Sequence, residues 1–266
     1  MCSSDLMIDD LTPLHQLKED MNESSAILFK PDKSYRLSQS GWGRSSSLLD
    51  GENHPNGVII NYYLKEFNKD NDFLKIQIKD ENKNLIRVFS NDIKKAKLDS
   101  DINIYENESF NILKLNPNSG GNRLIWDMRY PGFVSFEGMV LYSSPNVGPK
   151  VTPGIYSIEM TYNDEVFEHK FEIEKDPRLS LSQEDYARQL SFLLEVRDQV
   201  SLANKTIIDI RKIKNDLKYL TSKVSDKEQL IDIINRFNKE LELVENNIHM
   251  TKNQSRQDPL NYGIRI

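Results

Sequence analysis

The chain has 266 residues, of which 38% are hydrophobic and 29% charged, and its formal net charge is −6. This composition is typical of a soluble globular protein with enough chain for two modest domains. The acidic balance argues against a general binder of nucleic acids or anionic membranes, because such proteins are usually basic. No run of about 18 apolar residues occurs, so no transmembrane helix is expected.

Residues 1–55 are expected to form a lead-in and linker rather than a domain. Thr12 followed by Pro13 predicts a short helix to about Asp20, with Thr12 as its N-cap. Short apolar runs near residues 26–29 and 35–37 predict two short strands. The start of the chain lacks the basic and apolar regions of a signal peptide.

Residues 38–56 are rich in Ser, Gly, Asn and Pro, which is the composition of a loop or linker. Trp42 lies in this loop between two glycines. A tryptophan in that setting either makes one ordinary aromatic contact or stacks on a sugar or a neighbouring domain. Cys2 is the only cysteine, which excludes an intramolecular disulfide and a cysteine-based zinc cluster.

Residues 56–175 predict β structure, because short runs rich in β-branched and aromatic residues alternate with turn residues. The runs lie at residues 58–64, 73–78, 85–89, 110–115, 122–130, 155–162 and 166–173. About seven short strands favour a small antiparallel β-sandwich of the immunoglobulin or fibronectin type III kind. A Cys…Trp…Cys pattern is absent, so a true antibody-type domain is excluded.

The run at residues 122–130 has the clearest alternation in the chain. Its apolar set predicts one buried face, and that set consists of Leu124, Trp126, Met128 and Tyr130. Trp126 is the largest candidate core anchor. Asp127 and Arg129 are two residues apart and therefore share the outward face, where they form either an ordinary solvated ion pair or part of a contact surface.

Residues 153–173 predict a β-hairpin, because two alternating runs are joined by Asn163 and Asp164. His169 falls on the mostly apolar face of the second run. A lone histidine in that place is more often a core or strand-edge residue than a metal ligand.

Residues 176–256 predict an antiparallel helical hairpin, because the apolar period changes from 2 to 3.6. Ser182 with Asp185, and Ser225 with Glu228, fit capping boxes at the two helix starts. Two helices bury little by themselves, so their apolar stripes need a third helix, the sandwich or a partner. The first helix also carries a basic patch without aromatics, which favours a solvated face over nucleic-acid binding; it consists of Arg211, Lys212, Lys214 and Lys218.

No reaction centre is evident from motifs. The four histidines are far apart in the sequence, and no nucleophile elbow, P-loop or dinucleotide fingerprint occurs. A glycosidase needs two carboxylates at a fixed separation, and none of the 41 acidic residues is singled out. The sequence therefore implies no catalytic residue, cofactor or metal.

One string of residues does resemble a known family. Asn122–Pro131 reads Asn-Arg-Leu-Ile-Trp-Asp-Met-Arg-Tyr-Pro and resembles a motif of large exported bacterial proteins, usually labelled glycosyl hydrolase or sortilin-like, that contain BNR (Asp-box) repeat β-propellers. Further strings that resemble this family are Asp10–Leu14, Leu28–Pro31, Asn56–Leu64, Gly148–Pro149, Thr152–Tyr156, Lys175–Arg178, Arg197–Asp198, Ala203–Asn204 and Gln257–Tyr262. The resemblance covers most of residues 9–262, but only the C-terminal third of the family.

The resemblance implies an extracytoplasmic accessory module that packs on the propeller domain of its parent protein or on another protein. This chain contains no Asp-box, so no catalytic residue is carried over from the family. Residues 257–266 are expected to be a truncated tail. Trp42, Trp126, Asp127 and Arg129 are the candidate contact surface.

Two other functions remain open. A carbohydrate-binding or glycoside-hydrolysing domain would need exposed aromatics, such as Trp42, Tyr130 or Tyr142, beside a carboxylate pair in a groove. A cytoplasmic scaffold would fit the missing signal peptide.

Overall fold

The computed structural model describes residues 11–37, 55–98, 112–141, 146–223 and 227–258. The chain divides into two compact units. The β-rich unit comprises Met1–Pro131 and Pro149–Leu190, and the helical unit comprises Gly132–Gly148 and Ser191–Ile266. The first turns of the long C-terminal helix therefore belong to the β-rich unit, beyond the boundary predicted after residue 175.

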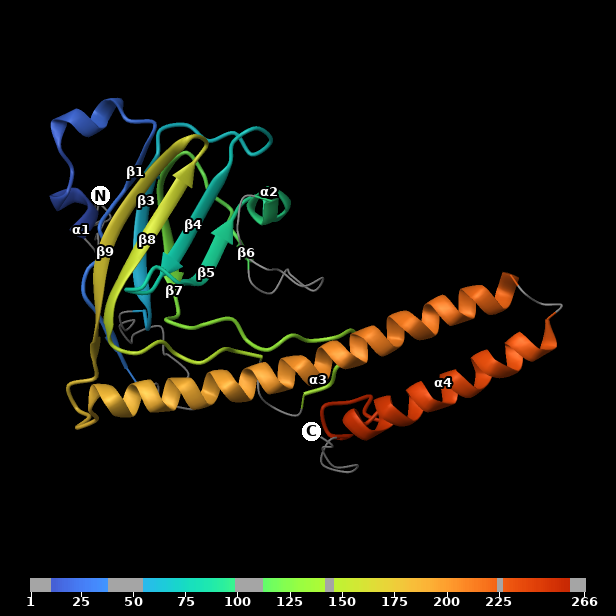
Figure 1. Ribbon diagram of the computed structural model, residues 1–266. Coiled ribbons are helices and arrows are strands. Elements are labelled where there is room, and N and C mark those ends of the chain that lie inside the picture. The colour runs from blue at the N-terminus through green and yellow to red at the C-terminus, as the bar shows by residue number, and fades with distance from the viewer. Residues whose placement is uncertain (1–10, 38–54, 99–111, 142–145, 224–226, 259–266) are drawn as a thin grey trace, which may run out of the picture. The chain divides into compact units, whose positions relative to one another are not determined.

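The β-rich unit contains two sheets (Figure 1). The smaller sheet has the antiparallel order β1 (Ala26–Leu28), β3 (Val58–Leu64) and β7 (Gly120–Trp126). The larger sheet has the order β2 (Ser34–Arg36), β9 (Glu165–Lys175), β8 (Gly154–Tyr162), β4 (Leu74–Lys79), β5 (Leu85–Ser90) and β6 (Ile112–Lys114). Two of its pairings, β2 with β9 and β5 with β6, are parallel. Each predicted strand is present, and β6 lies at an edge of the larger sheet.

One hydrophobic cluster draws side chains from both sheets. Strand β3 shows why, since every second residue from Val58 to Leu64 is buried, as its period-2 pattern predicts. Trp126 is only 1% exposed, and its ring makes edge contacts with Tyr156 and Phe171 at centroid distances of 6.0 and 6.3 Å. A second, smaller cluster lies where helix α2 (Ile93–Leu98) covers Phe73 and Val88.

Tyr156 closes a corner at the start of β8. Its hydroxyl donates a 2.6 Å hydrogen bond to the carbonyl oxygen of Thr152, four residues upstream. Burial raises the pKa of the Tyr156 hydroxyl to about 12, so the group stays a donor at any ordinary pH. This bond fixes the chain where it enters the central strand of the larger sheet.

Replacing Tyr156 with phenylalanine is expected to lower the free energy of unfolding by about 1 kcal/mol, because one buried hydrogen bond is lost while the ring still fills the core. Urea denaturation measures the change. Tyr219→Phe is the matched control, since the Tyr219 side chain is mostly exposed and its hydroxyl should contribute nothing measurable. Equal effects of the two substitutions would contradict a structural role for the corner.

Several predicted boundaries are wrong. The strand predicted to reach Tyr130 ends at Trp126, because Met128 adopts a left-handed backbone conformation with φ 59°. Helix α1 (Thr12–His15) stops well before Asp20 and is followed by a 3₁₀ turn, η1 (Glu19–Glu23). Its N-cap is Leu11 rather than Thr12, whose hydroxyl donates to Asp32 instead.

Helices α3 (Gln183–Lys223) and α4 (Glu228–Ile248) form the predicted antiparallel pair (Figure 1). The capping box at the start of α3 is confirmed, because Asp185 accepts hydrogen bonds from both the hydroxyl and the backbone N–H of Ser182. The second proposed cap, Ser225, lies outside the described residues. Among the helices of the described ranges, none is long and apolar enough to cross a membrane.

Candidate functional site

Three of the four residues of the predicted contact surface lie together at the end of β7 and in the turn that follows it. Trp42 lies outside the described residues, as does Tyr142. Trp126 is a core residue, and its indole N–H donates to the carbonyl oxygen of Arg129 at 3.2 Å. Including Trp126 in a contact surface was therefore wrong, because its ring does not reach solvent. Asp127 is exposed and Arg129 is half-buried.

Four cationic side chains gather at the end of the β-rich unit where Asp127 and Arg129 lie. We call this group the basic end; it consists of Arg36, Arg87, Arg129 and Lys150. The local backbone brings two of them together, because residues 129 and 150 form an antiparallel bridge. Arg36, at the end of β2, donates to the Val151 carbonyl oxygen at 2.8 Å. Net positive charge is thus concentrated in one place on an acidic protein.

Electrostatic repulsion within the basic end is visible at Lys150. Burial lowers the pKa of its ammonium group, and the positive charges of Arg129 and Arg36 lower it further, while Asp127 opposes them. The Lys150 ammonium group donates to the Leu37 carbonyl oxygen at 2.8 Å, which holds it in this position. The fold therefore fixes like charges close to one another.

Arg87 is the least satisfied member of the basic end. Its Nε and Nη1 atoms are buried and have no hydrogen-bond partner. Burial lowers the pKa of its guanidinium group, and only the charge of Asp127 acts in the other direction. A buried donor without a partner typically costs about 1–3 kcal/mol, so this arrangement needs a reason beyond stability.

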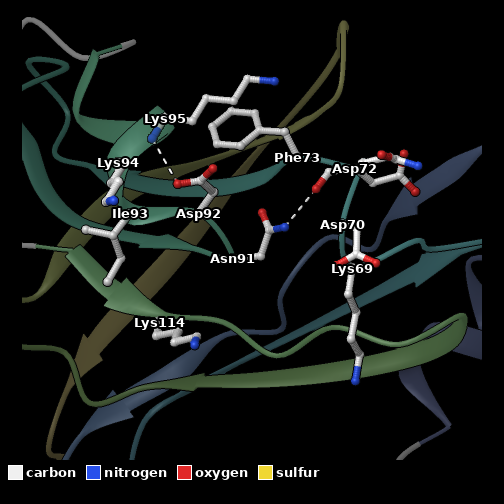
Figure 2. Close-up of a pocket in the computed structure, with 11 residues that line it drawn as sticks. Lys69, Asp70, Asp72, Phe73, Asn91, Asp92, Ile93, Lys94, Lys95 and Lys114 are labelled. Carbon is white, nitrogen blue, oxygen red and sulfur yellow. Dashed lines mark hydrogen bonds between the residues drawn. The ribbon is translucent and has the colours of Figure 1, made fainter.

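A pocket of about 370 Å³ lies at the opposite end of the larger sheet, near the start of β4 (Figure 2). Its walls carry Asp72, Phe73, Asn91 and Lys95 (Figure 2). The Lys95 ammonium group lies 4.6 Å from the centroid of the Phe73 ring, and the Asn91 amide donates to the Asp72 carbonyl oxygen at 2.8 Å.

Two carboxylates of this pocket, those of Asp72 and Asp92, hold turns in place. Asp72 accepts hydrogen bonds from the Asn68 backbone N–H, the Asn163 amide and the Tyr162 hydroxyl, and these donors hold its pKa below the usual range despite partial burial. Asp92 accepts from the backbone N–H of Lys95 in the first turn of α2. A general acid needs a raised pKa, so Asp72 does not have the character of one.

Metal ligation finds no support in geometry. Within the part of the chain that the structure describes, no group of three or more His, Cys, Asp or Glu side chains is placed to hold a metal ion. His169 donates from its Nε2 atom to the Leu28 carbonyl oxygen at 2.9 Å.

The helical unit exposes many large apolar side chains. Ile233 and Phe237 on α4 are 53% and 44% exposed although both belong to its apolar stripe. On α3, Ile213 and Leu220 are 38% and 49% exposed. We call this surface the apolar helix face; it consists of Ile213, Leu220, Leu230, Ile233, Phe237 and Val244.

The basic patch predicted on the first long helix is only partly a solvated face. Arg211 and Lys214 both turn toward Glu245 of α4, with nitrogen–oxygen distances of 2.8 and 3.2 Å. Glu245 is almost fully buried. The sequence signal for this contact was weak, since it consisted of an acid, Glu245, close to the apolar stripe of α4. Arg87 of the basic end gave no signal in the sequence beyond its place in a predicted strand.

The chain was compared with protein-family models, curated proteins and solved structures. No family model, no curated protein and no solved structure matches this chain.

Proposed function

We propose that this chain is a non-catalytic accessory and interaction module, which binds the propeller domain of an exported, sortilin-like parent protein. The proposal combines the residue strings that resemble the glycosyl-hydrolase-labelled propeller family with the surface of the helical unit. It places the module outside the cytoplasm. The apolar helix face is the single observation that carries the interaction role.

The apolar helix face supports docking for an energetic reason. Burying exposed apolar surface contributes about 25 cal/mol per Å², so two half-exposed side chains such as Ile233 and Phe237 favour association when a partner covers them. A contiguous set of such residues on one side of a helix pair typically marks a protein interaction site. A partner that presents an apolar ridge would complete the bundle.

We further infer that the β-rich unit is a variant of the immunoglobulin-like or fibronectin III-like sandwich. The parallel edge strand β2 and the Tyr156 corner at the start of the central strand β8 support this assignment. The parallel pairing of β5 with β6 at the other edge departs from a purely antiparallel sandwich. Such a unit would act as a rigid spacer within the module.

Sequencing the DNA on both sides of the reading frame tests the family assignment. An in-frame upstream region with Asp-box repeats is the expected result. A genuine start codon with its own ribosome-binding site directly before Met1 would overturn the assignment to a propeller protein.

The double substitution Ile233→Lys with Phe237→Lys is expected to weaken binding of the encoded propeller domain about 100-fold, because two apolar side chains would be replaced by charges that resist burial. Calorimetric titration measures the affinity. Leu243→Lys is the matched control, since Leu243 is exposed on α4 but lies off the stripe. Unchanged affinity of the double variant would refute docking through the apolar helix face.

Two alternatives remain as proposals. For a carbohydrate-binding or glycoside-hydrolysing domain, the expected result is no sugar release from chromogenic glycosides by the purified chain, because the Asp72 and Asp92 carboxylates of the described pocket are engaged in turns. For a cytoplasmic scaffold, the DNA sequence upstream of the reading frame is again decisive.

A further inference from the structure

Arg87 occupies an unusual place for a charged residue. It pairs with Ile78 across the β4–β5 ladder, and directly opposed residues point to the same face of a sheet. Ile78 is fully buried in the main core, so Arg87 lies on the core side of the sheet rather than on its outer surface. The guanidinium group is thus held at the margin of the core, where its Nε and Nη1 atoms have no partner.

Among the described residues, Asp127 is the acid whose charge acts on the Arg87 guanidinium group. Asp127 acts on Arg87, but the same carboxylate also faces Lys150 and accepts a hydrogen bond from the Arg129 backbone N–H. Arg36 is fixed beside them by its bond to the Val151 carbonyl oxygen and by stacking on the Tyr186 ring at 4.8 Å. Asp127 thus divides its charge between Arg87 and Lys150.

We propose that the basic end is a binding site for a single oxyanion of the carboxylate or phosphate type, with Arg87 as its principal ligand. A guanidinium fork presents two parallel N–H donors that match two oxygens of such a group. The bound anion would give buried donors of Arg87 their missing acceptor and would offset the repulsion among the cations. This site is independent of the apolar helix face and of the proposed function.

The first test is calorimetric titration of the whole chain with inorganic phosphate and, separately, with acetate, at constant ionic strength. A dissociation constant of about 1 mM is expected for the preferred anion, since a few charge-assisted hydrogen bonds supply that affinity. Binding of phosphate alone would indicate a phosphoryl ligand, and binding of acetate alone a carboxylate ligand. Arg87→Met should abolish the binding, and Arg87→Lys should weaken it about tenfold. Binding of neither anion would overturn the proposal.

Thermal unfolding supplies a second readout that a purely structural arginine would not give. Without anion, Arg87→Met is expected to raise the melting temperature, because an unsatisfied buried group is replaced by an apolar one of similar length. At about 100 mM of the preferred anion, the wild-type protein should gain roughly 5 °C relative to Arg87→Met. General salt stabilisation is common to both proteins and cancels in this difference.

Arg188→Gln is the matched control, because Arg188 is an exposed arginine of the same unit and pairs only with Glu184 at the surface. It should bind the anion like the wild type. Equal loss of binding in both variants would show a nonspecific charge effect and refute the site. A lower melting temperature of Arg87→Met without anion, together with unchanged anion binding, would assign Arg87 a structural role instead.

Discussion

Replacing Trp126 with alanine is expected to lower the free energy of unfolding of the β-rich unit by about 4 kcal/mol, which is the usual range for truncating a large buried aromatic side chain. Trp126 is 1% exposed and lies at the end of β7, where the smaller sheet meets Tyr156 and Phe171 of the larger one. A native domain is typically stable by only about 5–15 kcal/mol, so this one change would remove a large fraction of the total.

The expected loss has three physical sources. The indole ring loses its burial, a cavity remains between the two sheets, and the Arg129 carbonyl oxygen loses the donor that the indole N–H supplies at 3.2 Å. That bond also closes the turn through Met128, whose left-handed conformation ends the strand. The substitution is therefore expected to loosen the backbone next to Asp127 as well as the core.

Ile125→Ala is the matched control, since Ile125 is the preceding residue of the same strand but points to the other face and is partly exposed. A loss of about 1 kcal/mol is expected there. Guanidinium-induced unfolding, followed by the tryptophan-independent far-ultraviolet circular dichroism signal, measures both variants. Similar losses for the two residues would mean that Trp126 does not anchor the core.

The positions of the strands were predictable because the two faces of a strand such as β3 differ in burial. Every second residue of β3 is buried, and the same alternation marks the inner face of β8. The ends of the elements were not predictable from this pattern. Met128 turns the chain without the glycine or asparagine that usually signals a left-handed residue.

The basic end was not predictable because it depends on a register shift. The β4–β5 ladder is irregular between Ile78 and Lys79, so that Ile86 is an extra residue and Arg87 opposes the buried Ile78. Simple alternation would have kept Arg87 on the face opposite Ile86. The other cations come from segments more than 40 residues away, and nothing local in the sequence brings them together.

Replacing Glu245 with glutamine is expected to lower the free energy of unfolding of the helical unit by about 2 kcal/mol. The Glu245 side chain is 6% exposed and receives Arg211 and Lys214 on separate carboxylate oxygens. An amide keeps one acceptor oxygen but turns an NH₂ group toward one of the two cations. The loss stays below that of a fully buried pair because about a third of each cation remains exposed to water.

The same contact predicts how stability depends on pH. Burial raises the pKa of the Glu245 carboxyl, but the hydrogen bonds and charges of Arg211 and Lys214 outweigh burial and hold the pKa below its usual value. A carboxyl with a lowered folded-state pKa stabilises the protein above its unfolded pKa, near 4.3, and this contribution is lost as the pH falls through the folded-state pKa. The deficit of Glu245→Gln should therefore shrink as the pH falls below about 5.

Glu242→Gln separates this effect from general acid destabilisation, because Glu242 is an exposed acid on the same helix. His249 also lies near this contact: burial and the positive charge of Arg211 lower its pKa, while the negative charge of Glu245 opposes them. His249 therefore destabilises the fold below about pH 6.5, and this effect is larger in Glu245→Gln, which removes the opposing charge. In urea denaturation of the three proteins, the difference between the two glutamine variants therefore reports the Glu245 charge, both directly and through His249. A difference that does not change with pH would show that Glu245 contributes by its shape and not by its charge.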